Sequence, residues 1–162
     1  MLNPDQFRRE IIRPVLAMLD GRDDKPWGGD AAEELMLGTA LVESNLTYLV
    51  QHGEGPAVSV FQLEPATIED IQENYIRYRS LLREAVEFAS GVWPIMPEQV
   101  KGNLYLAAML CRIHYRRAPA PLPEAGDVGG QAKYWKKYYN TAKGKGTVGK
   151  YREAWKRSGI TN

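Results

Sequence analysis

An almost unbroken apolar segment limits what this sequence can fold into. Residues 31–42, AAEELMLGTALV, place apolar side chains on nearly every face of the helix that their pattern predicts. A helix that is apolar all round is buried in the protein, whereas a surface helix keeps one polar face. We therefore predict a central helix here, surrounded by the rest of the chain.

Glu43 directly follows this helix, in the sequence ALVES. A buried carboxylate costs free energy unless it is paired or kept protonated. A protonated glutamic acid in a partly apolar pocket is the general acid that a glycosidase needs. The alternative is that Glu43 marks the point at which the helix reaches solvent, and spacing alone leaves both interpretations open.

Helical patterns account for most of the remaining chain. The segment 57–64, AVSVFQLE, is the one place where a short strand is expected, and the Pro- and Gly-rich residues 118–130 are expected to form an internal linker. A chain of 162 residues is most simply one domain. We predict a mainly α fold, a single domain over residues 1–162, with at most a small strand region at 57–64.

Local signals predict where some of these helices begin or bend. Asn3 and Pro4 suit an N-cap and a first helical position. Asp30 with Glu33 suits a capping box at the start of the central helix. Pro14 lies inside the first helical pattern and should kink it.

Charge is unevenly distributed along the chain. Residues 131–162 hold nine Lys or Arg and one Glu, a local charge of +8, whereas residues 1–130 hold twelve against nineteen, a local charge of −7. A basic end favours an anionic partner such as nucleic acid or a polyanionic cell wall. Aromatic residues recur in this segment at helical spacing, so we expect amphipathic helices with aromatic rings inward and lysines in water, and no nucleic-acid partner.

Several classes of site are excluded or disfavoured. Cys111 is the only cysteine, so no intrachain disulfide is possible. His52 and His114 lack metal-ligand spacing, and we expect no metal and no other cofactor. The first residues carry charges where a signal peptide has an apolar core, and no apolar run reaches the length of a membrane span. We expect synthesis in a cytoplasm without a secretory signal.

Three short motifs occur in a fixed order along the chain. They are ALVES around Glu43 and Ser44, the segment GPAVSVFQLEPAT with Gln62, Pro65 and Thr67, and YYNTAKGKGTV with Tyr139 and Asn140. Together they resemble the motifs of the lytic transglycosylase and goose-type lysozyme superfamily, and in particular its phage-encoded members.

This resemblance implies a lysozyme-like fold and cleavage of peptidoglycan between N-acetylmuramic acid and N-acetylglucosamine. Glu43 would be the general acid. Ser44 and Gln62 would hydrogen-bond the sugars or hold the cleft wall, Tyr139 would orient the Glu43 carboxyl, and Asn140 would support its loop. Taken without the family, Gln62 reads as an ordinary polar residue and Tyr139 as core packing.

The chain also departs from the family pattern. Ser59 stands where the family usually has Gly, so its side chain is expected to narrow the cleft. Glu54 and Glu64 are the candidates for the second carboxylate that a hydrolase usually needs, although solvated surface positions explain both. Lytic transglycosylases manage with one acid, because the C6 hydroxyl of muramic acid attacks instead of water. We expect this single-acid chemistry, with Glu43 as its acid.

The same fold has a use other than catalysis. The alternative to an enzyme is a structural protein of the phage virion, in the tail or baseplate, that uses a lysozyme-like fold for assembly, with or without activity. Under the enzyme hypothesis the protein acts in the periplasm or cell wall, or travels there in the particle. Its partners are then glycan strands and other virion proteins.

Overall fold

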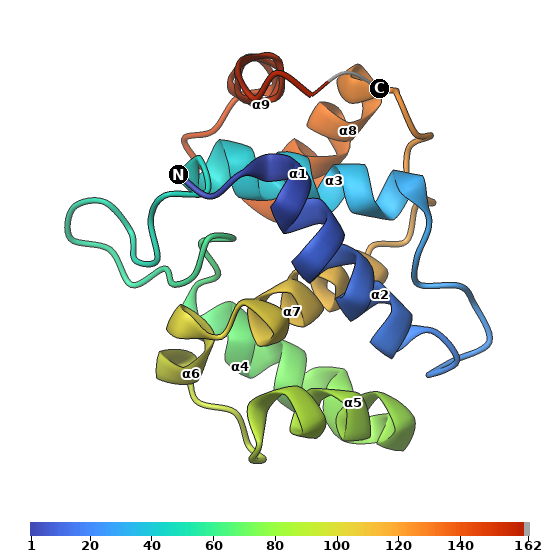
Figure 1. Ribbon diagram of the computed structural model, residues 1–162. Helices are drawn as coiled ribbons and strands as arrows, with labels where there is room; N and C mark the ends of the chain where they lie inside the picture. The colour runs from blue at the N-terminus through green and yellow to red at the C-terminus, as the bar shows by residue number, and fades with distance from the viewer. Residues whose placement is uncertain (161–162) are drawn as a thin grey trace.

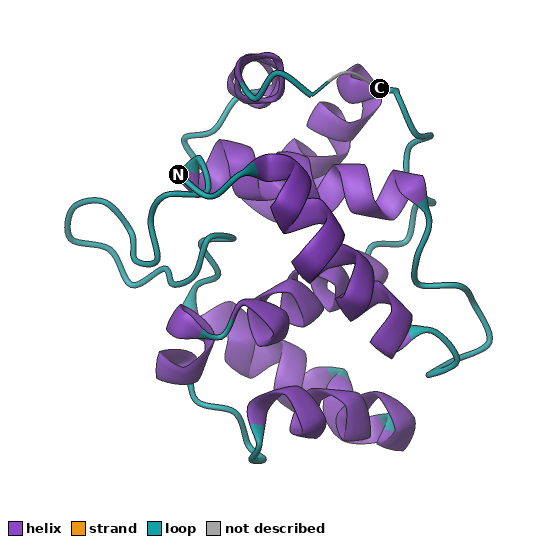
Figure 2. Cartoon of the chain, viewed as in Figure 1, coloured by secondary structure: helices purple, strands orange, loops and turns teal. Residues whose placement is uncertain are grey.

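A computed structural model describes residues 1–160, and the chain in it is mainly helical, as predicted (Figure 1; Figure 2). Within that range no helix is long and apolar enough to cross a membrane. The helical elements are α1 (Pro4–Phe7), η1 (Arg8–Ile12), α2 (Arg13–Leu19), α3 (Asp30–Ser44), α4 (Pro65–Asn74), η2 (Ile76–Tyr78), α5 (Ser80–Ser90), α6 (Pro97–Gly102), α7 (Leu104–Arg116), α8 (Val128–Trp135), η3 (Lys136–Asn140) and α9 (Val148–Arg157).

Helix α3 is the predicted central helix. Its residues from Ala32 to Leu41 are all buried, and it packs against η1, α7, α8 and α9. Gly38 allows α9 to come close, because a Cβ at that position would lie 1.9 Å from the Tyr151 hydroxyl oxygen. The apolar segment therefore forms a central helix on which N-terminal, middle and C-terminal parts of the chain pack.

The helices gather into two groups around α3 and α7 (Figure 1). Helices α8 and α9 cover one side of α3, while α4, α5 and α6 pack on α7. The N-terminal helices α1, η1 and α2 run across both groups, where η1 contacts α3 and α7 and α2 contacts α7. The long connection between α3 and α4, residues 45–64, lies beside the two groups, and it forms one wall of the pocket described below.

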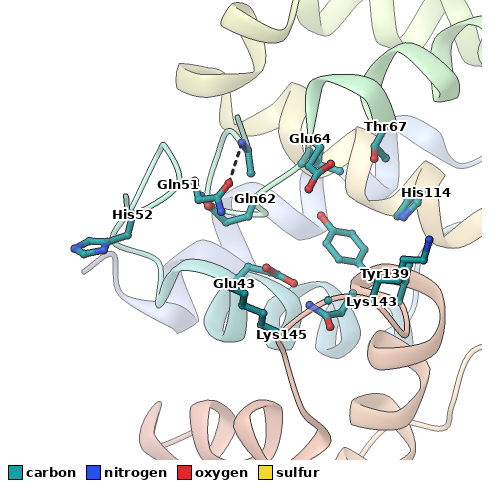
Figure 3. Close-up of a pocket in the computed structure, with 15 residues that line it drawn as sticks. Glu43, Gln51, His52, Gln62, Glu64, Thr67, His114, Tyr139, Lys143 and Lys145 are labelled. Atoms are coloured by element: carbon teal, nitrogen blue, oxygen red, sulfur yellow. Dashed lines mark hydrogen bonds between the residues drawn. The ribbon is translucent and has the colours of Figure 1, made fainter. Parts of the chain in front are cut away.

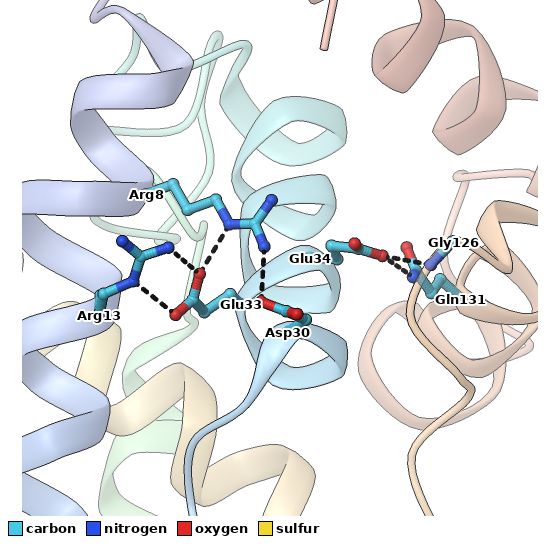
Figure 4. A network of polar contacts seen from close by, with 7 residues as sticks. All are labelled: Arg8, Arg13, Asp30, Glu33, Glu34, Gly126 and Gln131. Atoms are coloured by element: carbon cyan, nitrogen blue, oxygen red, sulfur yellow. Dashed lines mark hydrogen bonds and ion pairs between the residues drawn. The ribbon is translucent and has the colours of Figure 1, made fainter. Parts of the chain in front are cut away.

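Glu33 joins α3 to the N-terminal helices (Figure 4). Arg13 donates Nε to Glu33 Oε1 at 2.8 Å, and Arg8 donates Nε to Glu33 Oε2 at 2.7 Å. Burial alone would raise the pKa of Glu33, but the hydrogen bonds and positive charges of the two arginines hold it below its usual value. The predicted capping box is therefore wrong: Gly29 is the N-cap residue, Asp30 is the first helical residue, and Glu33 is an ion-pair partner.

Glu34 faces away from Glu33 and holds the chain that precedes α8 (Figure 4). Its Oε2 accepts hydrogen bonds from the Gly126 backbone N–H at 2.7 Å and from Gln131 Nε2 at 2.8 Å. The Pro- and Gly-rich linker predicted over 118–130 is shorter than expected. Helix α8 begins at Val128, because the Asp127 side chain accepts from the Gly130 N–H and caps it.

Two further expectations concern the backbone at Pro14 and in the segment 57–64. Pro14 lies in the first turn of α2, just after a π-helical turn, η1, and the helical backbone runs on from one into the other. Proline has no backbone N–H to donate. After a π turn, this missing donor interrupts no hydrogen bond that the helix requires. The segment 57–64 forms only isolated bridges, Val50 with Val58 and Val58 with Leu63, which agrees with the prediction of at most a small strand region.

Candidate active site

Glu43 lies in the last turn of α3, and the helix ends sharply just after it. Asn45 and Leu46 both adopt the left-handed region, with φ of 52° and 51°. Leu46 is buried, and its N–H donates to the Ala40 carbonyl. This turn directs the chain away from the helix axis and leaves the Glu43 side chain at the edge of the core, where the next loop faces it.

The Glu43 carboxyl has one polar partner among residues 1–160 and no ion-pair partner there. Trp135 donates its indole Nε1–H to Glu43 Oε1 at 2.9 Å, and Trp135 itself is buried. Burial raises the pKa of Glu43 to about 7, although the hydrogen bond from Trp135 lowers it in part. At neutral pH this carboxyl is therefore divided between its protonated and ionised forms.

Glu43 opens onto a pocket of about 610 Å³. In Figure 3, Glu43 lies on one side and Glu64 and Thr67 on the other, while the ring of His52 points outward at the edge. The pocket brings together segments that are distant in the sequence, and it contains three of the four predicted substrate-binding residues. The lining residues are Glu43, Gln51, His52, Ala57, Gln62, Leu63, Glu64, Thr67, His114, Tyr139, Asn140, Thr141, Lys143, Gly144 and Lys145.

Gln62 lines the pocket from a tight turn. Its φ is 50°, and its Nε2 donates to the Ser59 carbonyl at 2.8 Å. Ser59 also has a positive φ, 68°, which fits a position where a glycine is easily accommodated. Its side chain does not narrow the pocket as predicted, since Ser59 is fully buried and its hydroxyl accepts from the Phe61 N–H.

Ser44 belongs to the wall of the pocket and not to its surface. It is buried, and its hydroxyl oxygen lies 3.1 Å from the Ala40 carbonyl and 2.7 Å from the Val60 carbonyl, which accept from it. Of the two roles predicted for Ser44, the structure gives it the second: it ties the end of α3 to the loop that presents Gln62.

Tyr139 lines the pocket, but its hydroxyl does not bind Glu43. It donates to the Phe61 carbonyl at 2.7 Å, and the ring packs against Tyr115 and His114. The predicted orientation of Glu43 by Tyr139 is therefore corrected, because the hydrogen bond to Glu43 comes from Trp135. Tyr139 instead fixes the loop opposite the acid.

Asn140 supports the loop that closes one end of the pocket. Lys136 donates Nζ to Asn140 Oδ1 at 2.7 Å and to the Gly144 carbonyl at 2.9 Å. A Cβ at Gly144 would lie 2.3 Å from the Asn140 carbonyl oxygen, so this close turn requires glycine. Its position agrees with the supporting role predicted for Asn140.

The remaining titratable groups have distinct environments. Glu64 is exposed at the pocket rim and is the N-cap residue of α4, whereas Glu54 is exposed and does not line the pocket. Burial and the charge of Arg117 lower the pKa of His114 to about 4, so its ring is neutral at physiological pH. Its Nδ1 has no hydrogen-bond partner in residues 1–160. In the same range no cluster of His, Cys, Asp and Glu could hold a metal ion.

Backbone strain is concentrated around this pocket. Asn45, Leu46, Ser59, Gln62 and Thr141 are the non-glycine residues with positive φ in the described part of the chain, and all lie in its walls or in the turns that lead to them. Such conformations cost on the order of 1 kcal/mol each and persist where the surrounding structure imposes them. Their position marks this pocket as the candidate functional site.

Trp135 is the site residue that sequence reasoning missed. Its aromatic spacing predicted core packing, which is correct for the ring, but the pattern gives no sign of what the indole N–H binds.

A search of protein-family models, of curated proteins and of solved structures finds no match for the chain.

Proposed function

We propose that this protein cleaves the glycan strands of peptidoglycan, between N-acetylmuramic acid and N-acetylglucosamine, with Glu43 as the general acid. One observation carries the proposal: a partly buried carboxyl with a pKa of about 7 opens onto a pocket large enough for sugar residues. A general acid works best when its pKa lies near the working pH. The motif resemblance of Glu43, Gln62 and Tyr139 supplies the substrate class.

In this mechanism Glu43 protonates the oxygen of the glycosidic bond as that bond to C1 breaks. Trp135 donates to one carboxyl oxygen and so fixes the orientation of the other toward the pocket. The loop held by Ser44 and Tyr139 keeps Gln62 in place to hydrogen-bond the sugar. The protonated form of Glu43 is the active one, so we expect kcat/KM to fall as pH rises through about 7.

The same residues support intramolecular attack in preference to hydrolysis. The muramic C6 hydroxyl attacks C1 and forms a 1,6-anhydro ring, and its proton passes to the carboxylate that Glu43 has become. No water enters, so no second carboxylate is needed. Glu64 lies at an exposed helix start, where a carboxylate is favoured by the helix dipole alone.

The test is digestion of purified peptidoglycan sacculi, with the products identified by mass spectrometry. We expect 1,6-anhydromuramic ends, which are lighter by one water than reducing ends. Glu43→Gln should lower the rate by at least about a hundredfold, the usual scale for general acid catalysis.

Glu64→Gln is the matched control, because it removes a carboxylate from the same pocket, and its activity should stay within about twofold of the parent. Unchanged lysis by folded Glu43→Gln protein would refute the proposed acid. Reducing ends alone, with activity lost in Glu64→Gln, would instead assign a hydrolase with two carboxylates.

An exposed apolar surface favours a second candidate function, assembly into a phage particle. A groove of about 390 Å³ is lined largely by apolar residues, including Leu46, Leu49, Val60 and Leu104. Leu49 and the adjacent Val50 are about half exposed. Exposed apolar patches of this kind mark protein contacts. Under this proposal the protein is detected by mass spectrometry in purified virions, and its absence from them would exclude the role.

A further inference from the structure

Another pocket lies at the C-terminal end of α7 and shares no lining residue with the Glu43 pocket. Its volume is about 350 Å³. The walls come from the last turns of α7, the residues that follow it, Tyr134 of α8, and Lys25 from the loop before α3. The lining residues are Lys25, Arg112, Tyr115, Arg116, Ala118, Pro119, Ala120, Pro121, Leu122 and Tyr134.

Arg112 is the unusual residue in this pocket. It is 4% exposed, yet within residues 1–160 it forms no ion pair. Its Nε donates to the Trp27 carbonyl at 2.9 Å, and the two terminal nitrogens have no hydrogen-bond partner in that range. A buried charge without a counter-charge is energetically unfavourable, and buried arginines are normally paired.

The neighbouring charges do not neutralise Arg112. Arg116 also lines the pocket, but its own partner is Asp23, together with backbone carbonyls. Lys25 is exposed at the rim, and its ammonium has no carboxylate partner among the described residues. Burial and the charge of Arg116 lower the pKa of Arg112 to about 10, which agrees with an environment that lacks a compensating anion.

The other walls are apolar and held in place. Tyr134 donates its hydroxyl to the Ala120 carbonyl at 2.8 Å, which fixes the segment that carries Pro119 and Pro121. The proline rings restrict the backbone, so this wall is formed before any ligand arrives. The pocket thus combines a buried planar cation with aromatic and proline surfaces in its lining.

We propose that this pocket binds a small organic oxyanion, with a carboxylate or phosphate head on the Arg112 guanidinium and an apolar body between the tyrosine and proline walls. The planar fork of arginine matches both head groups through two parallel hydrogen bonds. Arg116 and Lys25 add long-range attraction at the rim. The site is separate from the Glu43 pocket, so it is tested by binding and does not depend on activity.

The test is isothermal titration of the full chain, at fixed pH and ionic strength, with benzoate, phenyl phosphate, inorganic phosphate and neutral benzamide. We expect saturable binding of benzoate and phenyl phosphate, each at least about threefold tighter than inorganic phosphate, and none of benzamide. The thermal midpoint should rise with the concentration of either aromatic anion.

Three variants separate a ligand site from a structural arginine. Arg112→Met should weaken binding of both aromatic anions at least tenfold, whereas Arg117→Met, at the C-cap of α7 and paired with Asp70 outside the pocket, should stay within about twofold. Arg112→Lys keeps the charge without the planar fork, and several-fold weakening is expected even if the Met variant does not fold.

Three outcomes would overturn the proposal. One is no saturable binding to the parent protein, which would make Arg112 a purely structural residue stacked on Trp27. Another is equal binding by the parent, Arg112→Lys and a folded Arg112→Met. The third is benzamide binding as tightly as benzoate, because an anion site does not bind a neutral amide.

Discussion

The two ends of α3 each carry a glutamate, and the two carboxyl groups lie in opposite electrostatic environments. Glu33, in the first turn, is held between Arg8 and Arg13, and its pKa is lowered. Glu43, in the last turn, meets a single indole N–H and no cation among residues 1–160, and its pKa is raised to about 7. Partners, and not burial alone, therefore decide whether a carboxyl of this helix is a structural anion or a proton donor.

The helix itself adds to this difference. An anion near a helix N-terminus interacts favourably with the positive end of the dipole, and an anion near the C-terminus meets the negative end. Glu33 lies at the favourable end and Glu43 at the unfavourable end. The carboxyl with the unfavourable helix-dipole interaction, Glu43, thus lies at the pocket. The one with the favourable interaction, Glu33, lies where α3 joins the N-terminal helices.

The largest expected effect is the dependence of stability on the ionisation of Glu43. Its pKa is raised in the folded state, so that state binds more protons than the unfolded chain between about pH 4.5 and 7. The free energy of unfolding should therefore fall by roughly 2–3 kcal/mol as pH rises through this window, allowing for contact of the carboxyl with pocket water. Urea titrations of the parent and of Glu43→Gln at several pH values measure it.

In Glu43→Gln this part of the pH dependence should disappear, and the variant should equal or exceed the parent in stability at pH 8. Parallel pH curves for the two proteins would show that Glu43 is not the group that titrates. The comparison between the two ends of α3 would then fail.

A smaller effect of opposite sign is expected at Glu33. Glu33→Gln removes charge-assisted hydrogen bonds to two arginines and should cost about 1.5 kcal/mol at pH 7, because Arg13 is half exposed and water screens its share. The folded-state pKa of Glu33 is lowered, so its contribution is present above the unfolded pKa and is lost as pH falls through the folded value.

Parent and Glu33→Gln should therefore converge in stability at strongly acidic pH, and peptidoglycan cleavage per folded molecule should be unchanged. If the variant kept full stability but lost cleavage, Glu33 would be needed for activity and could not be classed as a purely structural carboxyl.

The smallest effects should distinguish Trp135 from Tyr139. Trp135→Phe removes the N–H that stabilises ionised Glu43, so the alkaline limb of kcat/KM should move to higher pH by up to about one unit. Tyr139→Phe leaves the buried Phe61 carbonyl without its donor and should cost about 1 kcal/mol of stability, with the limb unmoved. A moved limb in Tyr139→Phe would return the orienting role to that residue.

The sequence was sufficient where one dominant physical effect decides the outcome. An all-apolar helix has no stable place except the core, so the position of α3 was predictable. The Asn3 cap and Pro4 at the first helical position were also predictable, because they act within a few residues of chain. Motif order then brought Gln62, Tyr139 and Asn140 to the same pocket as Glu43.

Hydrogen-bond partners were not predictable, because they depend on how distant segments are placed. Tyr139 and Asn140 lie in the π-helical turn η3, where the number of residues per turn differs from that of an α-helix. Helical periodicity therefore does not fix the directions of their side chains. Arg112 likewise appears in the sequence as one of several basic residues near the end of α7, and only the fold shows that it is buried and unpaired.

The long separation between Glu43 and Trp135 has a consequence for the newly made chain. The two residues are 92 positions apart, which at ribosomal speeds of 5–20 residues per second corresponds to roughly 5–20 s of synthesis. Throughout that interval the nascent chain contains the carboxyl but not the indole that orients it, nor α8 and α9 that cover α3. The hydrogen-bonded acid therefore forms only after Trp135 has been synthesised, and a chain that terminates before Trp135 never contains it.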